Sequence, residues 1–568
     1  MKLARGIRLT AAGAAALLGI LASSASAATA PPPLPDPTRT AAGESGPSAA
    51  GPAPDARPGR PATATQEPAG RPPAVRGPAA AQAGQPAAAE RAPARFDLDG
   101  DGRDELVVGT TVEQLGRALH VRYSSRSAAQ TLTAPTGSYP DWRFQLEFTS
   151  GDFDGDGIGD LAVAAVRTVS STVFEHGLFV YEGGPAGLDR AGVRLLTGLT
   201  VGALAAGDVD GDGRDDLAVS DGSANVAGHP PFRGSVTVLR GGADGLTRTG
   251  EIVVRQVLAG WSGLVEEYFG GSLAIGDFTG DGYGDLAVGG FRRGARESDV
   301  HGMVTLFPGS AGGPDPTRAS KVEGQFELTG SLPVDVLAMA DLNLDGRSDL
   351  VLGLPRYGSG EIVYLPGAAA GLSAAGHRRI NQDTPGVPGE SDQDSTGGGF
   401  GFSLATGDAT GDGVPDLLVG ANTMSVGSVP DAGAVYLLPG TANGPTGAGS
   451  YAYRQGAAPA GGRKPNPHHL DRAEENDYLG ASAALLDLDG VGPLEIFVGS
   501  AHEDLSEAPS GTSIGLLTEL RLDRDPPRRG EPARPALVRL AAVTLYRPAD
   551  LPVAGGRISR IGPGLLAG

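Results

Sequence analysis

Short apolar segments, separated by turn-forming residues, recur along the chain from Phe96 to its C-terminal end. They are rich in Val, Leu and Ile and are bounded by Gly, Pro and Asp, a composition typical of β-strands in a turn-dense fold. No useful length of chain shows the apolar spacing of an amphipathic helix. The pattern predicts an all-β domain over residues 95–568.

The apolar segments follow one another in a fixed order. A first strand, such as Tyr268–Ile275, precedes an acidic turn, and a second, such as Asp285–Gly290, follows it. The third begins with a glycine, at Gly234, Gly302, Gly360 and Gly433. Weaker segments, such as Val193–Gly198 and Arg255–Gly260, are expected to form the outermost strand. The unit recurs every 55 to 79 residues, which suits one four-stranded sheet per repeat.

The acidic turn between the first two strands has the chemistry of a calcium loop. Its clearest copy, Asp152–Asp160, reads DFDGDGIGD, with carboxylates at loop positions 1, 3, 5 and 9 and a glycine at position 6. Two unit charges about 4 Å apart repel by roughly 4 kcal/mol at an effective dielectric constant of about 20. Ca²⁺ relieves such repulsion and accepts oxygen ligands in a flexible geometry. Gly157 permits the tight turn, and the Ile158 carbonyl is expected to add a ligand.

Six copies of the loop are expected to bind Ca²⁺. A lone Asp-Gly pair often marks an ordinary hairpin, and the repetition favours a metal. The candidate ligands, by repeat, are Asp97, Asp99, Asp101 and Glu105; Asp152, Asp154, Asp156 and Asp160; Asp208, Asp210, Asp212 and Asp216; Asp277, Thr279, Asp281 and Asp285; Asp341, Asn343, Asp345 and Asp349; and Asp408, Thr410, Asp412 and Asp416. Mg²⁺ fits less well because it prefers strict octahedral geometry. The nine-residue length and flanking strands also differ from an EF-hand.

The loops are not expected to be equivalent. Thr and Asn at position 3 keep an oxygen but lower the charge, so repeats 4, 5 and 6 are expected to bind Ca²⁺ more weakly than repeats 2 and 3. The seventh repeat keeps Asp487, Asp489 and Glu495 but has Val491 at position 5. We expect it to hold no ion and to be stabilised by hairpin hydrogen bonds alone.

Composition and charge narrow the class of protein. The 568 residues include 91 glycines, and the formal net charge of −21 makes nucleic acid an unsuitable partner. Six Ca²⁺ ions would offset more than half of this charge. The chain has no cysteine, which excludes disulfides and thiol chemistry. Bound Ca²⁺ is then the available cross-link for an exported domain.

The N-terminal region has the composition of an export signal followed by a linker. Residues 1–27 combine basic residues, an apolar core and a small-residue cleavage site, which indicates a signal peptide rather than a membrane anchor. Residues 28–94 are rich in Ala, Pro and Gly and are expected to be a disordered linker. This linker either carries the domain through a cell wall or is a plain spacer. No later stretch is apolar enough to span a membrane.

Two-residue pairs at the starts of first strands point to a known family. Phe269-Gly270, Phe400-Gly401 and Leu479-Gly480 each precede an acidic loop, and a small-residue turn follows the next strand. This pattern resembles the FG-GAP repeat of the integrin α-subunit propeller, in the secreted bacterial type. The resemblance implies a seven-bladed β-propeller of four-stranded blades, with a Ca²⁺ loop between the first two strands of each blade. The Phe-Gly pair is missing in blades 2, 3 and 5, and no blade has a full Gly-Ala-Pro.

The C-terminal segment is expected to complete blade 1. No strand precedes Asp97, because Arg91–Phe96 is short and contains Pro93. Ile561–Gly568 aligns with the first strand Phe269–Gly276. We therefore expect the tail to supply the missing strand and close the ring, which hides sheet edges. A frayed tail is the alternative.

The expected function is binding rather than catalysis. The main hypothesis is a secreted, monomeric, adhesion-like or scaffold module, with association with the cell wall as one option. It is expected to contact an extracellular protein or glycan through the long loops Arg292–Val300, Asn381–Gly399 and Ala457–Tyr478. The alternative is a hydrolase or lyase acting on extracellular polysaccharide, and a third option is a structural wall protein. Trp142 and Trp261 could stack on a sugar, but burial is the commoner role. No acid, base and aromatic residues stand out as a catalytic set.

Overall fold

The computed structural model divides the chain into two compact units, residues 1–90 and 91–568, and only the second contains described residues. The described residues are 96–112, 116–125, 129–135, 137–170, 173–225, 232–255, 267–293, 300–323, 334, 336–355, 359–389, 398–455, 473, 475–500, 516–524, 538–546 and 558–565. The predicted signal peptide and linker lie outside them. So do Trp261 and residues 294–299, 390–397 and 456–472, which hold much of the three long loops.

The second unit is a seven-bladed β-propeller whose described part contains strands and no helix. Blades 1 and 2 contain β28 (Ile558–Leu565), β1 (Leu106–Val112), β2 (Gly116–Arg122), β3 (Gln130–Leu132), β4 (Trp142–Gly151), β5 (Asp160–Ser170), β6 (Val173–Tyr181) and β7 (Arg194–Thr197). Blades 3 and 4 contain β8 (Leu204–Gly207), β9 (Asp216–Asn225), β10 (Phe232–Arg240), β11 (Thr247–Val254), β12 (Glu267–Gly276), β13 (Asp285–Arg293), β14 (Val300–Phe307) and β15 (Ser320–Glu323). Blades 5 to 7 contain β16 (Val336–Ala340), β17 (Asp349–Leu354), β18 (Glu361–Leu365), β19 (Arg378–Ile380), β20 (Phe400–Gly407), β21 (Asp416–Ala421), β22 (Ala434–Leu438), β23 (Tyr451–Tyr453), β24 (Leu479–Leu486), β25 (Glu495–Ser500), β26 (Leu516–Arg524) and β27 (Val538–Tyr546).

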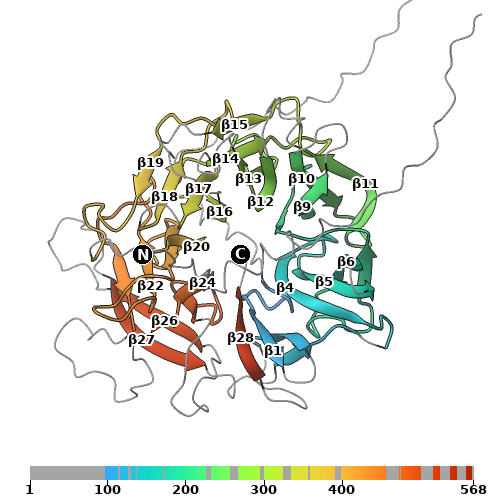
Figure 1. The fold of residues 1–568 in the computed structure, drawn as a ribbon, viewed down its shortest axis with the longest axis horizontal. Coiled ribbons are helices and arrows are strands. Elements are labelled where there is room, and N and C mark those ends of the chain that lie inside the picture. Colours follow the sequence, from blue (N-terminus) through green and yellow to red (C-terminus); the bar gives the residue numbers. More distant parts are fainter. Residues whose placement is uncertain are drawn as a thin grey trace, which may run out of the picture. The chain divides into compact units, whose positions relative to one another are not determined.

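Each blade is a four-stranded antiparallel sheet, as the sequence predicts, and the blades follow one another around a ring (Figure 1). Blades 3 and 4 are also joined through their backbones, because the first residues of β10 form a short parallel pairing with the first residues of β12. The outermost strand in the described part of blade 3 is Thr247–Val254, in which Ile252–Val254 pair directly with β10. Of the predicted segment Arg255–Gly260 only Arg255 is described, just after β11, and the other five residues lie outside the described residues.

The strand β28 occupies the first position of blade 1, beside β1 (Figure 1). Its register is the one that the alignment with blade 4 predicts: Val108 pairs with Leu565 and Thr110 with Ile561, as Val288 pairs with Leu273 and Gly290 with Phe269. The irregular step between the two pairs is also shared. Blade 1 therefore has the same strand order as the other blades.

The buried core lies between neighbouring blades. One cluster, for example, joins Phe153 and Leu178 of blade 2 to Leu217 of blade 3. Another joins Phe497 of blade 7 to Leu106 of blade 1 and continues into blade 2. Trp142 is buried in this second cluster, which confirms the packing role and removes it as a sugar platform. A search of the described residues finds no helix long and apolar enough to cross a membrane.

Candidate metal centre

The acidic loops lie where the first strand of a blade turns into the second. In blade 2, β4 ends at Gly151 and β5 begins at Asp160, the ninth loop residue. The turn needs two left-handed residues, Gly155 (φ 81°) and Gly157 (φ 88°), which confirms the role predicted for the position-6 glycine. Blade 5 has Leu344 at position 4 with φ 57°, a conformation that strains a residue with a Cβ atom.

The first aspartate of each loop holds the turn together. In blade 2, Asp152 Oδ1 accepts hydrogen bonds from the N–H groups of Gly155 (2.8 Å) and Asp156 (3.1 Å), and Oδ2 accepts one from Gly157 (2.9 Å). The first aspartates of the other loops accept bonds from the corresponding amides. This residue therefore shapes the loop as well as presenting oxygen atoms, a role that the sequence reasoning missed.

The ninth residue links the loop to the third strand of its blade. Asp160 Oδ2 accepts the Phe153 N–H (3.0 Å), and Oδ1 accepts the N–H of Gly183, just after β6 (2.9 Å). Asp216 and Asp416 make the corresponding bonds to Gly241 (2.9 Å) and Gly440 (3.0 Å). The glycines that follow the third strands were the available signal for this link.

The loops bring predicted ligands together to different extents. Carboxylate oxygens of three residues lie within 4.8 Å of one another in the groups Asp97, Asp99 and Asp101; Asp152, Asp154 and Asp156; Asp208, Asp210 and Asp216; and Asp487, Asp489 and Glu495. Blades 4, 5 and 6 form no such group of acids among the described residues, since Thr or Asn stands at position 3.

The pKa of the ninth loop residue is raised in several blades, because this residue is buried close to other carboxylates. Burial, reinforced by neighbouring carboxylates, raises the pKa of Glu105 to about 8. The same causes raise the pKa of Asp160 to about 7 and that of Asp416 to about 7. Backbone N–H groups oppose the shift in each case but do not cancel it. A nearby cation would restore the charged form.

The side chain at position 3 shows how well the loops that lack an acid there could bind a cation. Thr410 Oγ1 in blade 6 is buried and has no hydrogen-bond partner among the described residues, so this oxygen is available to a ligand. Asn343 in blade 5 differs, because its Nδ2 points toward Asp345 Oδ2 (3.2 Å) and Asp349 Oδ1 (3.3 Å). The Asn343 side chain therefore donates hydrogen bonds to two of the acids that a cation in blade 5 would need.

Blade 7 corrects one prediction. Its loop is held by hydrogen bonds to Asp487 and Asp489, as expected, but not by these alone. Arg521 Nη1 lies 2.7 Å from Asp489 Oδ2 and 3.3 Å from Glu495 Oε1. The sequence analysis did not assign Arg521 to this loop, because twenty-five residues lie between Glu495 and Arg521 in the sequence.

Neighbouring loops are joined by backbone hydrogen bonds, which we call the loop belt. The N–H of position 8 in one blade donates to the carbonyl of position 1 in the preceding blade. The bonds are Gly159 to Asp97 (2.7 Å), Asp215 to Asp152 (2.8 Å), Gly284 to Asp208 (2.8 Å), Ser348 to Asp277 (2.7 Å), Leu494 to Asp408 (3.1 Å) and Asp104 to Asp487 (2.9 Å). The last bond joins blade 1 to blade 7. Between blades 5 and 6 the donor is missing, because position 8 is Pro415.

The Phe-Gly pairs lie at another contact between blades. Gly401 and Gly480 have positive φ in a bulge of the first strand. The residue before each one bridges to the glycine that opens the third strand of the preceding blade, as in Gly360 to Phe400 and Gly433 to Leu479. The glycines are needed because two backbones approach closely there.

Comparison with known proteins agrees with this arrangement. The FG-GAP repeat model matches residues 200–239 and 400–438, which lie in blades 3 and 6. The chain carries FG-GAP repeats. The blade 3 match shows that an FG-GAP repeat is recognisable where the Phe-Gly pair itself is absent.

The chain also resembles integrin α-subunits. It is 31% identical over 173 residues to integrin alpha-3 of Cricetulus griseus, covering 30% of this chain and 16% of the relative. It is 29% identical over 213 residues to integrin alpha-7 of Mus musculus, covering 37% and 16%. It is 31% identical over 192 residues to integrin alpha pat-2 of Caenorhabditis elegans, covering 31% and 14%. The matches span about a sixth of the length of these relatives.

Proposed function

We propose that this protein is a secreted, calcium-stabilised propeller that acts as an extracellular binding or scaffold module. The observation that carries the metal assignment is the grouping of three carboxylates within 4.8 Å of one another in each of the loops of blades 1, 2 and 3. The proposed ligands are the four residues at positions 1, 3, 5 and 9 of blades 1 to 6. When bound, Ca²⁺ would neutralise these acids and cross-link each loop.

The chain's own residues prepare the loops for an ion. The first aspartate keeps its oxygens in place by accepting three backbone N–H groups. The ninth residue anchors the loop to the third strand, so an ion held by both residues would connect three strands of a blade. The predicted stability gain follows from binding to the folded state alone.

A count of bound ions tests this assignment. The mature protein is dialysed against Ca²⁺, its metal content is measured by elemental analysis, and its melting temperature is recorded before and after EGTA treatment. We expect about six Ca²⁺ per chain, a lower melting temperature after chelation and recovery when Ca²⁺ is returned. Absence of Ca²⁺ together with an unchanged melting temperature would reject the proposal.

A variant in one loop separates specific loss from general damage. Replacing Asp152, Asp154 and Asp156 together with Asn should remove one ion and leave the others. Asp244→Asn, an exposed aspartate outside the loops, serves as the control and should leave the ion count unchanged. Loss of every ion from the triple variant would point to unfolding and requires a circular dichroism check.

The binding role rests on the resemblance to integrin α-subunits and on a fold that presents loops around a ring. A screen of extracellular proteins and glycans, with product analysis, tests it. Retention without turnover supports a binding module, turnover replaces it with the hydrolase or lyase alternative, and neither outcome leaves the structural scaffold.

Export is proposed from residues 1–27, with residues 28–94 as the linker to the propeller. N-terminal sequencing of protein from the culture medium should begin at Ala28. Gel filtration of the same material should give the size of a monomer, and protein found only inside the cell would contradict this part of the proposal.

A further inference from the structure

Two arginines occupy the same place in different blades. Arg240 follows Leu239, which pairs with Leu217, the residue after Asp216 of the blade 3 loop. Arg521 follows Leu520, which pairs with Ile496, the residue after Glu495 of the blade 7 loop. By register, each arginine therefore stands on the third strand opposite the ninth residue of its own loop. The same place holds Tyr123, Glu182, Pro308, Pro366 and Pro439 in blades 1, 2, 4, 5 and 6.

In blade 7 the guanidinium lies among the acids of the loop. Arg521 Nη1 contacts the carboxylates of positions 3 and 9, at 2.7 Å from Asp489 Oδ2 and 3.3 Å from Glu495 Oε1. Arg521 Nε also donates to Glu519 Oε1 at 2.6 Å. Asp489 and Glu495 belong to the group of three acids whose oxygen atoms lie within 4.8 Å of one another. The guanidinium therefore already occupies acids that a metal ion would need.

The rest of this loop has also lost its fit to an ion. Position 5 is Val491, whose side chain is 74% exposed and offers no oxygen. A guanidinium needs fewer acceptors than Ca²⁺ because it donates directed hydrogen bonds to planar carboxylates. The absence of an oxygen ligand at Val491 and the presence of the Arg521 guanidinium are therefore two independent reasons why this loop does not fit Ca²⁺.

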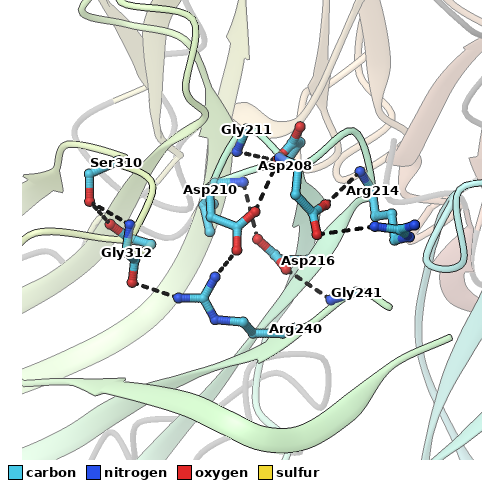
Figure 2. A network of polar contacts seen from close by, with 12 residues as sticks. Asp208, Asp210, Gly211, Arg214, Asp216, Arg240, Gly241, Ser310 and Gly312 are labelled. Carbon is cyan, nitrogen blue, oxygen red and sulfur yellow. Dashed lines mark hydrogen bonds and ion pairs between the residues drawn. The ribbon is translucent and has the colours of Figure 1, made fainter. Parts of the chain in front are cut away.

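Blade 3 shows the same arginine beside a complete set of ligands. Figure 2 shows Arg240 reaching Asp210 at position 3, with which it forms an ion pair. Its Nη2 donates to the carbonyl of Gly312 in blade 4 (2.6 Å). Asp216 points instead to the N–H of Gly241 (Figure 2). Arg240 thus holds one of the four acids that an ion in blade 3 would need.

We propose that Arg521 takes the place of the metal ion in blade 7, and that Arg240 competes with the ion for Asp210 in blade 3. The inference rests on the proposed calcium binding of the other loops and deepens it. It makes blade 7 independent of Ca²⁺, and it lowers the affinity of blade 3 below that of blade 2, although both loops carry four aspartates.

The test rebuilds the blade 7 site in steps and follows Ca²⁺ by calorimetric titration and elemental analysis of the full mature chain. Val491→Asp restores the missing ligand, and Val491→Asp with Arg521→Met also removes the guanidinium. The control is Val491→Asp with Arg248→Met, because Arg248 pairs with Glu251 on the outer strand β11 and donates to the carbonyls of Thr197 and Gly198, none of which belongs to an acidic loop.

The double variant with Arg521→Met should gain one Ca²⁺ relative to the natural chain, with an affinity at least about tenfold above that of Val491→Asp alone. The Arg248 control should behave like Val491→Asp. Equal affinity with and without Arg521, or no additional ion in either variant, would overturn the proposal. If the natural chain binds no Ca²⁺ at all, the calcium assignment of the other loops is overturned instead. The effect of Arg521 can then still be judged from the Ca²⁺ bound by the two Val491→Asp variants.

Two further measurements remain informative if removal of Arg521 unfolds the protein. Asp487→Asn with Asp489→Asn should leave the number of bound ions unchanged, and loss of one ion would show that blade 7 binds metal despite Arg521. In blade 3, Arg240→Met should strengthen Ca²⁺ binding at one site, and an unchanged set of affinities would show that Arg240 does not compete.

Discussion

Backbones of neighbouring blades approach each other closely at the glycines that open the third strands. A Cβ atom at Gly360 would lie 2.2 Å from Phe400 N, and one at Gly433 would lie 2.2 Å from Leu479 O. Both glycines also have positive φ, 87° and 85°. A side chain would therefore meet backbone atoms that cannot move without separating the blades.

The first prediction concerns Gly360→Ala. We expect it to reduce the free energy of unfolding by about 2–4 kcal/mol, because left-handed strain and a clash with backbone act together. The control, Gly250→Ala, has φ 77° but no atom within 4 Å of its Cβ position, and should cost only about 1 kcal/mol. Urea unfolding of both variants measures the difference, and similar losses would contradict the proposed contact.

The second prediction concerns pH and the ninth loop residues. Without Ca²⁺, the pKa values of Asp160 and Asp416, about 7 in the folded protein, exceed the value of about 4 expected in the unfolded chain. The folded state then binds more protons across this window, so the free energy of unfolding falls as the pH rises. Ca²⁺ replaces the protons, so its stabilising effect should grow with pH.

Thermal melts of Ca²⁺-free and Ca²⁺-loaded protein between about pH 5 and pH 8 measure this effect. Asp416→Asn removes one titrating group and should make the decline of the Ca²⁺-free protein less steep. A Ca²⁺-free melting temperature that increases with pH would oppose the assigned electrostatics.

At the scale of the element, first strands and their loops were predictable and outer strands less so. The apolar run of β12 and the acids of its loop are visible in the sequence, and the register of β28 followed from one alignment. The outermost strand β11 was not predicted, because most of its residues are partly or fully exposed and its apolar pattern is weak. Arg521 could not be assigned to its loop, since that contact depends on the register of β25 and β26.

The third prediction concerns β28. Deleting residues 557–568 should lower the melting temperature by more than about 5 °C, because β1 would lose its inner neighbour and expose an edge. Deleting residues 566–568 alone leaves β28 in place and is the control. A full deletion that melts with the control would show that β28 adds nothing to blade 1.

At the scale of the whole molecule, the loop belt joins blades through backbone groups. Its donors include Gly, Asp, Ser and Leu residues, so no side-chain pattern could reveal it in the sequence. Only the proline at position 415 marks a gap. The first aspartates belong both to this belt and to the proposed metal sites, so an ion bound in one loop would also stabilise the junction with the neighbouring blade.

The fourth prediction concerns the junction of blades 5 and 6. Pro415→Ala supplies an N–H at the position that donates in the other blades, and it should slow amide exchange in the loop Asp341–Asp349. Hydrogen–deuterium exchange with mass spectrometry measures this, with the loop Asp152–Asp160 as an internal reference. Unchanged exchange in blade 5 would show that the gap has no effect on this junction.

The pairing of β1 with β28 joins the two ends of the propeller sequence. During translation, β1 emerges before its inner partner β28, because the strands of the six other blades lie between them in the sequence. Until β28 is made, the inner edge of β1 has no strand to pair with, while the six other blades are synthesised. A chain interrupted before β28 would leave the inner edge of β1 unpaired and open to pairing with another chain.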